Sequence, residues 1–140
     1  MHIAIVSGEY PPRWGGIGSV VFHLAGHMVD LGHEVTIITR SHTSKVPSQE
    51  GVEVISVNWA KIPMAFTRSY GKHAIRALYN LNKRKPIDII NAHLPLVSWK
   101  AKEFSNLEKK IAPVVSCLHG SRIGETVSYT HLTLPTNREV

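Results

Sequence analysis

The sequence predicts an α/β protein: a Rossmann-like parallel sheet with helices on both faces. Short apolar runs bounded by turn residues alternate with longer segments in which apolar residues recur at helical spacing. A loop rich in glycine and proline, 8–18, follows the first apolar run, as is typical of the ligand-binding edge of such sheets. The near-continuous apolar character of the runs indicates strands that are buried on both sides, so helices must cover both faces.

The predicted elements follow in the order β-α-β-β-α-β-α-β. A strand over 3–7 leads into the glycine loop, and Ser19 then caps a helix that ends at Gly32, where glycine favours a left-handed C′ position. The other strands are expected at 34–39, 52–57, 87–92 and 113–118, and the other helices after Pro63 and over 96–110. Right-handed crossovers would bring the carboxyl ends of all strands to one edge.

The composition fits one domain that carries no leader sequence and no membrane span. The chain has 140 residues, of which 43% are hydrophobic and 19% are charged. Its single cysteine, Cys117, excludes an internal disulfide, and we expect a cytoplasmic location. The net charge of +6 permits contact with phosphates, nucleic acid or an anionic membrane without choosing among them.

The final stretch, 127–140, breaks with the pattern before it. One reading frame of a sequencing-library adapter encodes the segment from Val127 to Thr136, so we expect an adapter-derived read-through tail. An ordinary edge strand is the alternative. We therefore assign residues 1–126 to a partial domain and expect the native sequence after Thr126 to be missing.

Three glycines before the first predicted helix form a candidate anion site: Gly15, Gly16 and Gly18. Glycine lets a ligand approach the backbone closely, and free N–H groups at a helix start attract anions. The spacing differs from the dinucleotide fingerprint, and the second strand ends at Arg40 without an acidic residue, although Arg40 could read a 2′-phosphate. The alternatives are a tight turn without a ligand, a dinucleotide-dependent oxidoreductase domain and a non-catalytic α/β binding module.

The residues at this loop resemble the opening of family 4 glycosyltransferases. The resemblance rests on EYPPxxGGIG at 9–18 and LGHEVTIIT at 31–39, with IDIINAH at 87–93 and VVSCLHG at 114–120 following in the same order. It implies a retaining enzyme of the GT-B fold, of which this chain is the N-terminal, acceptor-side domain. In that family a second domain with a Glu-x7-Glu element binds the nucleotide-sugar. No residue here corresponds to that element, so we expect the chain alone to be inactive.

The resemblance also implies roles for single residues. The approach to the donor diphosphate falls on Gly15, Gly16 and Gly18, and the active-site histidine falls on His119. Glu9 and His93 are acceptor-side candidates, for which structural roles are the alternatives. The resemblance to GT-B enzymes implies no metal ion, which fits the lack of a paired-carboxylate cluster, and no cofactor; the donor substrate is a nucleotide-diphosphate sugar. The acceptor is a sugar, a lipid-linked molecule or a small molecule.

A basic face is predicted on the second helix. Arg68, Lys72 and Arg76 step by four, opposite an apolar stripe, so they can rest on an anionic membrane; a solvated face is the alternative. Nucleic-acid binding is not expected, because no aromatic residues interleave with the charges. His23 and His27 have the i, i+4 spacing of metal ligands, but no third ligand lies near them in the sequence, so we expect a surface pair.

Overall fold

The computed structural model describes residues 1–8, 10, 16–41, 49–59, 66–93 and 98–117, and it confirms the predicted order of elements. Within these ranges the strands are β1 (His2–Ser7), β2 (Glu34–Arg40), β3 (Val52–Val57), β4 (Ile89–His93) and β5 (Val114–Ser116). The helices are α1 (Gly16–Asp30), α2 (Phe66–Arg84) and α3 (Ala101–Lys110).

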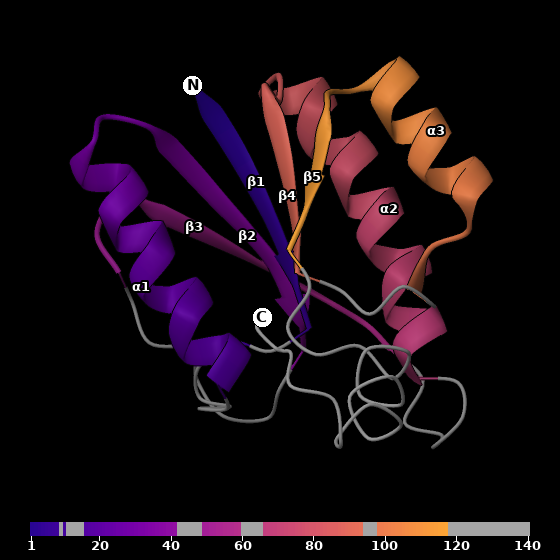
Figure 1. Ribbon diagram of the computed structural model, residues 1–140, viewed down its shortest axis with the longest axis horizontal. Helices are drawn as coiled ribbons and strands as arrows, with labels where there is room; N and C mark the ends of the chain where they lie inside the picture. Colours follow the sequence, from indigo (N-terminus) through magenta and orange to yellow (C-terminus); the bar gives the residue numbers. More distant parts are fainter. Residues whose placement is uncertain (9, 11–15, 42–48, 60–65, 94–97, 118–140) are drawn as a thin grey trace, which may run out of the picture.

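The strands form one parallel sheet in the order β3-β2-β1-β4-β5. Figure 1 shows α1 on one side of this sheet and α2 and α3 on the other. The chain runs outward from β1 to β3 and then crosses back past β1 through α2, so the strand order reverses between β1 and β4. This reversal is a topological switch point, the position at which parallel α/β sheets bind their ligands.

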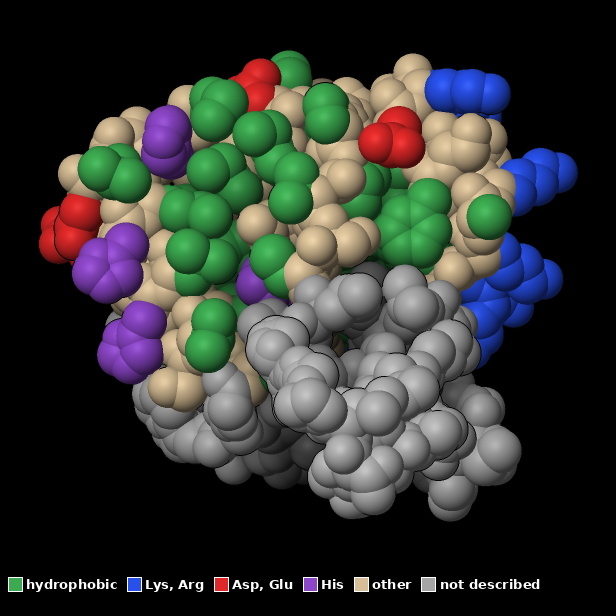
Figure 2. All heavy atoms as spheres, in the orientation of Figure 1, with side chains coloured by type: hydrophobic (Ala, Val, Ile, Leu, Met, Phe, Trp, Pro, Cys, Tyr) green, Lys and Arg blue, Asp and Glu red, His purple; other side chains and the backbone are tan. Residues whose placement is uncertain are grey.

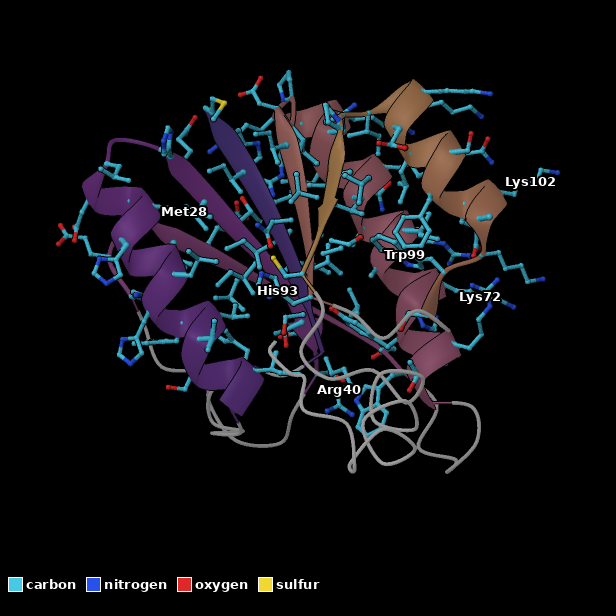
Figure 3. The ribbon with its side chains drawn as sticks, in the orientation of Figure 1. Met28, Arg40, Lys72, His93, Trp99 and Lys102 are labelled. Atoms are coloured by element: carbon cyan, nitrogen blue, oxygen red, sulfur yellow. The ribbon has the colours of Figure 1, made fainter. Side chains whose placement is uncertain are left out.

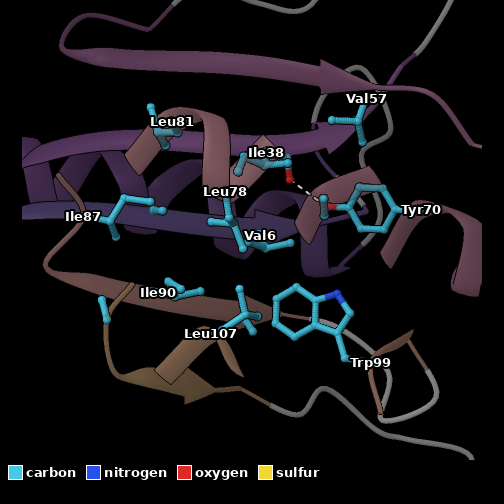
Figure 4. Packing of buried hydrophobic residues seen from close by; sticks show 14 residues of the cluster. Val6, Ile38, Val57, Tyr70, Leu78, Leu81, Ile87, Ile90, Trp99 and Leu107 are labelled. Carbon is cyan, nitrogen blue, oxygen red and sulfur yellow. Dashed lines mark hydrogen bonds between the residues drawn. The ribbon is translucent and has the colours of Figure 1, made fainter. Parts of the chain in front are cut away.

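Both faces of the central strands are buried, as predicted, because successive residues point to opposite sides. Ile5 of β1 packs with Val21 and Ala25 of α1. The next residue, Val6, packs on the other face in a cluster with α2 and α3 (Figure 4), whose buried helical members are Tyr70, Ala74, Leu78, Leu81 and Leu107. Burial of each large aliphatic side chain contributes about 1.5–3 kcal/mol, so the sheet is stabilised from both sides.

Helix α1 ends as predicted but begins earlier. Gly32 has a φ of 92°, and its amide donates to the carbonyl of Val29 at 2.9 Å, which stops the helix. The helix begins at Gly16 and includes Ser19, so the predicted N-cap at Ser19 is wrong. Ile17 in this extra turn packs against the cluster under α1, which favours a helix there despite a penalty of about 1 kcal/mol for each glycine.

The last two elements are shorter than predicted. Helix α3 begins at Ala101 instead of 96, after Trp99 has packed against α2 and donated its indole N–H to the carbonyl of Gly71 at 2.9 Å. The amide of Lys100 donates to the Glu103 carboxylate, which caps the start of the helix. Strand β5 covers Val114–Ser116, whereas the prediction covered 113–118, of which residue 118 lies outside the described residues.

Candidate functional site

The carboxyl ends of the strands lie along one edge of the sheet, at the bottom of Figure 1. Ser7 at the end of β1 pairs in register with His93 at the end of β4. Because these two strands flank the switch point, Ser7 and His93 border the place where a ligand of this fold binds. Arg40 ends β2, on the other side of β1.

Two of the predicted glycines lie at the start of α1, and Gly15 and Glu9 lie outside the described residues. Gly16 is the first residue of α1, and Gly18 is buried in its first turn. Amides in the first turn have no acceptor within the helix and carry the positive end of its dipole. Contrary to the prediction, Gly16 and Gly18 therefore belong to the helix and not to the loop before it.

His93 is buried at the end of β4, with 4% of its surface exposed. Since Ala92 points into the α2–α3 cluster, alternation places the His93 side chain on the side of α1. Figure 3 shows His93 near the carboxyl ends of the central strands. The predicted catalytic residue, His119, lies outside the described residues, so the structure brings together Ser7, His93 and the start of α1 without it.

Two contacts of the segment that follows β1 are missing from the sequence-based prediction. Arg40 donates its Nε–H to the carbonyl of Gly8 at 2.7 Å, and its guanidinium lies 4.8 Å from the centre of the Trp59 ring. The Tyr10 hydroxyl donates to Oε1 of Gln49 at 3.2 Å, and burial raises the pKa of Tyr10 to about 12. Arg40 could have been found from the sequence, because it ends a predicted strand and therefore lies at the ligand-binding edge. Gln49 has no such signal, because it lies in a polar stretch.

The basic face of α2 is partly neutralised. Arg68 donates to both carboxylate oxygens of Glu103, at 2.5 and 3.1 Å, and to the carbonyl of Ser98 at 2.9 Å. This hydrogen-bonded pair holds the pKa of Glu103 below its usual range. Lys72 and Arg76 are exposed and line, with Arg68, a depression of about 350 Å³. The shared face is confirmed, yet one of its three charges already has a carboxylate partner.

The histidine pair on α1 is exposed. His23 and His27 both lie on the outer surface of the helix. Over the described ranges, no three His, Cys, Asp or Glu side chains come together in a way that could hold a metal ion. Among the same residues, none of the helices combines the length and the apolar composition that crossing a bilayer requires.

The parallel sheet and its switch point, with the start of α1 following β1, define a Rossmann-like domain whose ligand edge lies where β1 and β4 end. The sequence profile of Glycosyltransferase Family 4 matches residues 14–137. The chain belongs to this family. Membership relates the chain to glycosyltransferases and not to dinucleotide-dependent oxidoreductases.

Similar proteins agree with this family. The glycogen synthase of Mycobacterium tuberculosis is 32% identical over 146 residues, which cover 89% of this chain and 34% of that protein. The GPI3 subunit of phosphatidylinositol N-acetylglucosaminyltransferase from Saccharomyces cerevisiae is 27% identical over 95 residues, which cover 66% of this chain and 21% of that protein. Sucrose-phosphate synthase from Thermosynechococcus elongatus superposes with a TM-score of 0.64 at 15% identity, covering 85% of this chain and 33% of that one, which shows the GT-B-like fold alone. The chain thus spans about a third or less of these relatives.

Proposed function

We propose that this chain is the acceptor-side, N-terminal part of a retaining, cytoplasmic glycosyltransferase that transfers a sugar from a nucleotide-diphosphate donor. The observation that carries the proposal is the start of α1 at Gly16, which follows β1 at the switch point of the sheet. Family membership supplies the reaction class. The helix start supplies amide donors of the sign that a diphosphate requires.

The amides of Gly16 and Gly18 act on the leaving group in this proposal. As the bond from the sugar to the diphosphate breaks, the sugar becomes oxocarbenium-like and negative charge grows on the departing phosphate. N–H dipoles that are fixed in advance stabilise this growing charge more than they stabilise the ground state. Gly15 extends the same amide group, His119 hydrogen-bonds the transferred sugar, and Glu9 and His93 serve the acceptor side.

The donor-binding half lies outside this chain in our proposal, and the native protein continues after Thr126 in place of 127–140. The chain covers 34% of the glycogen synthase that it matches, which leaves room for a second domain. Figure 2 shows apolar side chains gathered across the molecule between α1 and α3, and Val115 on β5 is 49% exposed. Because apolar patches of this kind mark covered surfaces, we expect another part of the protein there and no turnover from this chain alone.

The test uses the intact gene product that contains this sequence. It is incubated with UDP- and GDP-sugars and with glycan and lipid-linked acceptors, and the anomeric configuration of the product is read by NMR. We expect transfer with retention, and an unchanged rate in EDTA, because no metal ion or cofactor takes part. Turnover by the 140-residue chain alone would contradict the proposal that activity requires a donor-binding domain outside this chain.

A glycine substitution tests the role of the helix start. Gly16→Val places a branched side chain beside the amide donors, and we expect kcat to fall about a hundredfold, the effect of losing one oxyanion-type donor. The control is Gly32→Asn at the other end of α1, where the φ of 92° strains any side chain but asparagine less than most, so it tests a helix glycine far from the amide donors. We expect the control to stay within about twofold of the parent. Undiminished transfer by Gly16→Val would refute the proposal.

Contact with an anionic membrane is a second part of the proposal, for a lipid-linked acceptor. It is supported by the exposure of Lys72 and Arg76 on one side of a depression, and the name of the yeast relative includes a phosphatidylinositol substrate. Each basic residue at such a surface contributes about 1 kcal/mol, so the double change to Gln should weaken binding to phosphatidylserine vesicles about thirtyfold. The control changes Lys102 and Lys109 of α3 to Gln. An equal loss of vesicle binding in the control would contradict the proposal that the basic face of α2 is the membrane-contacting surface.

A further inference from the structure

The chain leaves β1 through Gly8, and two side chains enclose this residue. A Cβ atom at Gly8 would lie 3.3 Å from Nε of Arg40 and 3.6 Å from Cε2 of Tyr70. Tyr70 is held in place, because its buried hydroxyl donates to the carbonyl of Ile38 at 2.6 Å, the bond drawn in Figure 4. The backbone at Gly8 is therefore set by a strand on one side and by α2 on the other.

Arg40 holds the carbonyl of Gly8 and is itself held by an aromatic ring. The Nε–H···O distance is 2.7 Å, and a hydrogen bond from a charged donor is about twice as strong as a neutral one. The guanidinium lies 4.8 Å from the ring centre of Trp59, and the indole N–H donates to the carbonyl of Ser41 at 3.1 Å. Because Ser41 follows Arg40 directly, the ring is tied to the strand end whose arginine it covers.

A second contact holds Tyr10, two residues further along. The Tyr10 hydroxyl donates to Oε1 of Gln49 at 3.2 Å, and Nε2 of Gln49 donates to the carbonyl of Phe22 in α1 at 3.1 Å. Gly26, one turn after Phe22, makes room for this side chain, since a Cβ there would lie 2.7 Å from Nε2 of Gln49. Gln49 therefore joins the segment that follows β1 to the helix into which that segment leads.

We propose that Arg40 and Gln49 are positioning residues that fix the two neighbours of position 9, Gly8 and Tyr10, and so set the start of α1 relative to the end of β1. The inference rests on the proposed function and deepens it, because amide donors stabilise a developing charge only when they are held in place before the reaction. Arg40 and Gln49 act through the backbone that they hold and not through contact with the substrate.

The first experiment measures kinetics in the intact gene product. Arg40→Met keeps the length of the side chain and removes its donors, and we expect kcat to fall at least about tenfold while the KM for the donor changes less than about threefold. Trp59→Phe keeps an aromatic face for the guanidinium and should retain most of the kcat that Trp59→Ala loses. The matched control is Arg84→Met, which removes an arginine from an exposed ion pair with Glu53 at 2.9 Å.

The second experiment measures hydrogen exchange of backbone amides in the same proteins and requires no activity. We expect faster exchange at Tyr10 and over 16–20 in Arg40→Met and Gln49→Ala, and no change there in Arg84→Met. Unchanged exchange overturns the inference, whether or not kcat falls, and so does a fall in kcat that merely parallels the loss of thermal stability. Faster exchange in a protein whose parent transfers no sugar leaves the positioning role standing and refutes the proposed function instead.

Discussion

The two edges of the sheet are built differently. At the amino edge, polar groups form hydrogen bonds with one another. His2 donates through Nδ1 to the carbonyl of Pro86 at 2.9 Å, and its Nε2 lies 2.8 Å from Oγ1 of Thr36. The amide of His2 also donates to the Asp88 carboxylate at 2.7 Å. At the carboxyl edge, the side chain of Arg40 instead holds the backbone of the segment that leaves the sheet. One edge ties strands together, whereas the other orients a connecting segment.

The difference separates stability from function within one sheet. The polar groups at the amino edge bond mainly to one another, whereas a binding edge must keep amides available for a ligand. Two exposed ion pairs at the amino edge, Lys85–Glu34 and Arg84–Glu53, each at 2.9 Å, contribute little to stability because water screens them. Substitutions at the amino edge should therefore reduce stability, and those at the carboxyl edge should reduce sugar transfer.

The largest effect on the free energy of unfolding is expected from His2→Ala at the amino edge. The imidazole is 3% exposed, so alanine leaves a cavity and deprives the buried Thr36 hydroxyl of its partner. We expect the free energy of unfolding, measured in urea, to fall by about 3 kcal/mol. Arg40→Met should lower it by about 1.5 kcal/mol, because the hydrogen bond that is lost has a charged donor. Equal losses at the two positions would break the comparison between the edges.

Two matched hydroxyl deletions sharpen the comparison. Thr36→Val at the amino edge and Tyr70→Phe near the carboxyl edge each remove one buried hydrogen bond, so each should cost about 1 kcal/mol of unfolding free energy. Burial raises the pKa of Tyr70, so its hydroxyl remains a donor at working pH. Because Tyr70 borders Gly8, Tyr70→Phe should also lower kcat in the intact protein about threefold. A similar loss of kcat in Thr36→Val would contradict the assignment of stability to the amino edge and of sugar transfer to the carboxyl edge.

The fold could be read from the sequence because local signals carry it. Apolar runs and helical periodicity locate all the described strands and helices, and Gly32 marks the end of α1 through a backbone conformation that glycine favours. The rule that ligands bind at the carboxyl ends of parallel strands also locates the candidate site and His93. The predicted start of α1 was wrong because Ile17 packs against the core under the helix, a tertiary contact that outweighs the local preference of glycine.

The contacts that hold the site could not be read in the same way. Arg40 meets Gly8 across 32 positions, and Tyr10 meets Gln49 across 39. No periodicity links residues so far apart, and the geometry of long polar side chains depends on the folded backbone. The basic face of α2 gives a further example. The sequence could not predict that Arg68 pairs with Glu103, because the two residues are 35 positions apart.

The smallest expected effect is the difference in stability between the ion pairs at the two ends of α2. Arg68–Glu103, near its start, is 28% and 24% exposed, whereas Lys85–Glu34, just past its end, is 39% and 65% exposed. Each pair lowers the pKa of its carboxyl group, chiefly through the side-chain hydrogen bond. Glu103→Gln should reduce the free energy of unfolding at pH 7 by about 0.5 kcal/mol, and Glu34→Gln should have no measurable effect.

The pH dependence of this difference follows from the sign of the shift at Glu103. A carboxyl group with a lowered folded-state pKa contributes its stability above the ordinary glutamate value of about 4.3 and loses it as the pH falls through the lower folded value. The gap in unfolding free energy between the parent and Glu103→Gln should therefore persist from pH 7 to about pH 5 and vanish once the pH has fallen through the lowered folded-state pKa. Urea titrations at a series of pH values measure it. A gap that stays constant into acid would show that packing of the Glu103 side chain, and not its charge, stabilises α3 against α2.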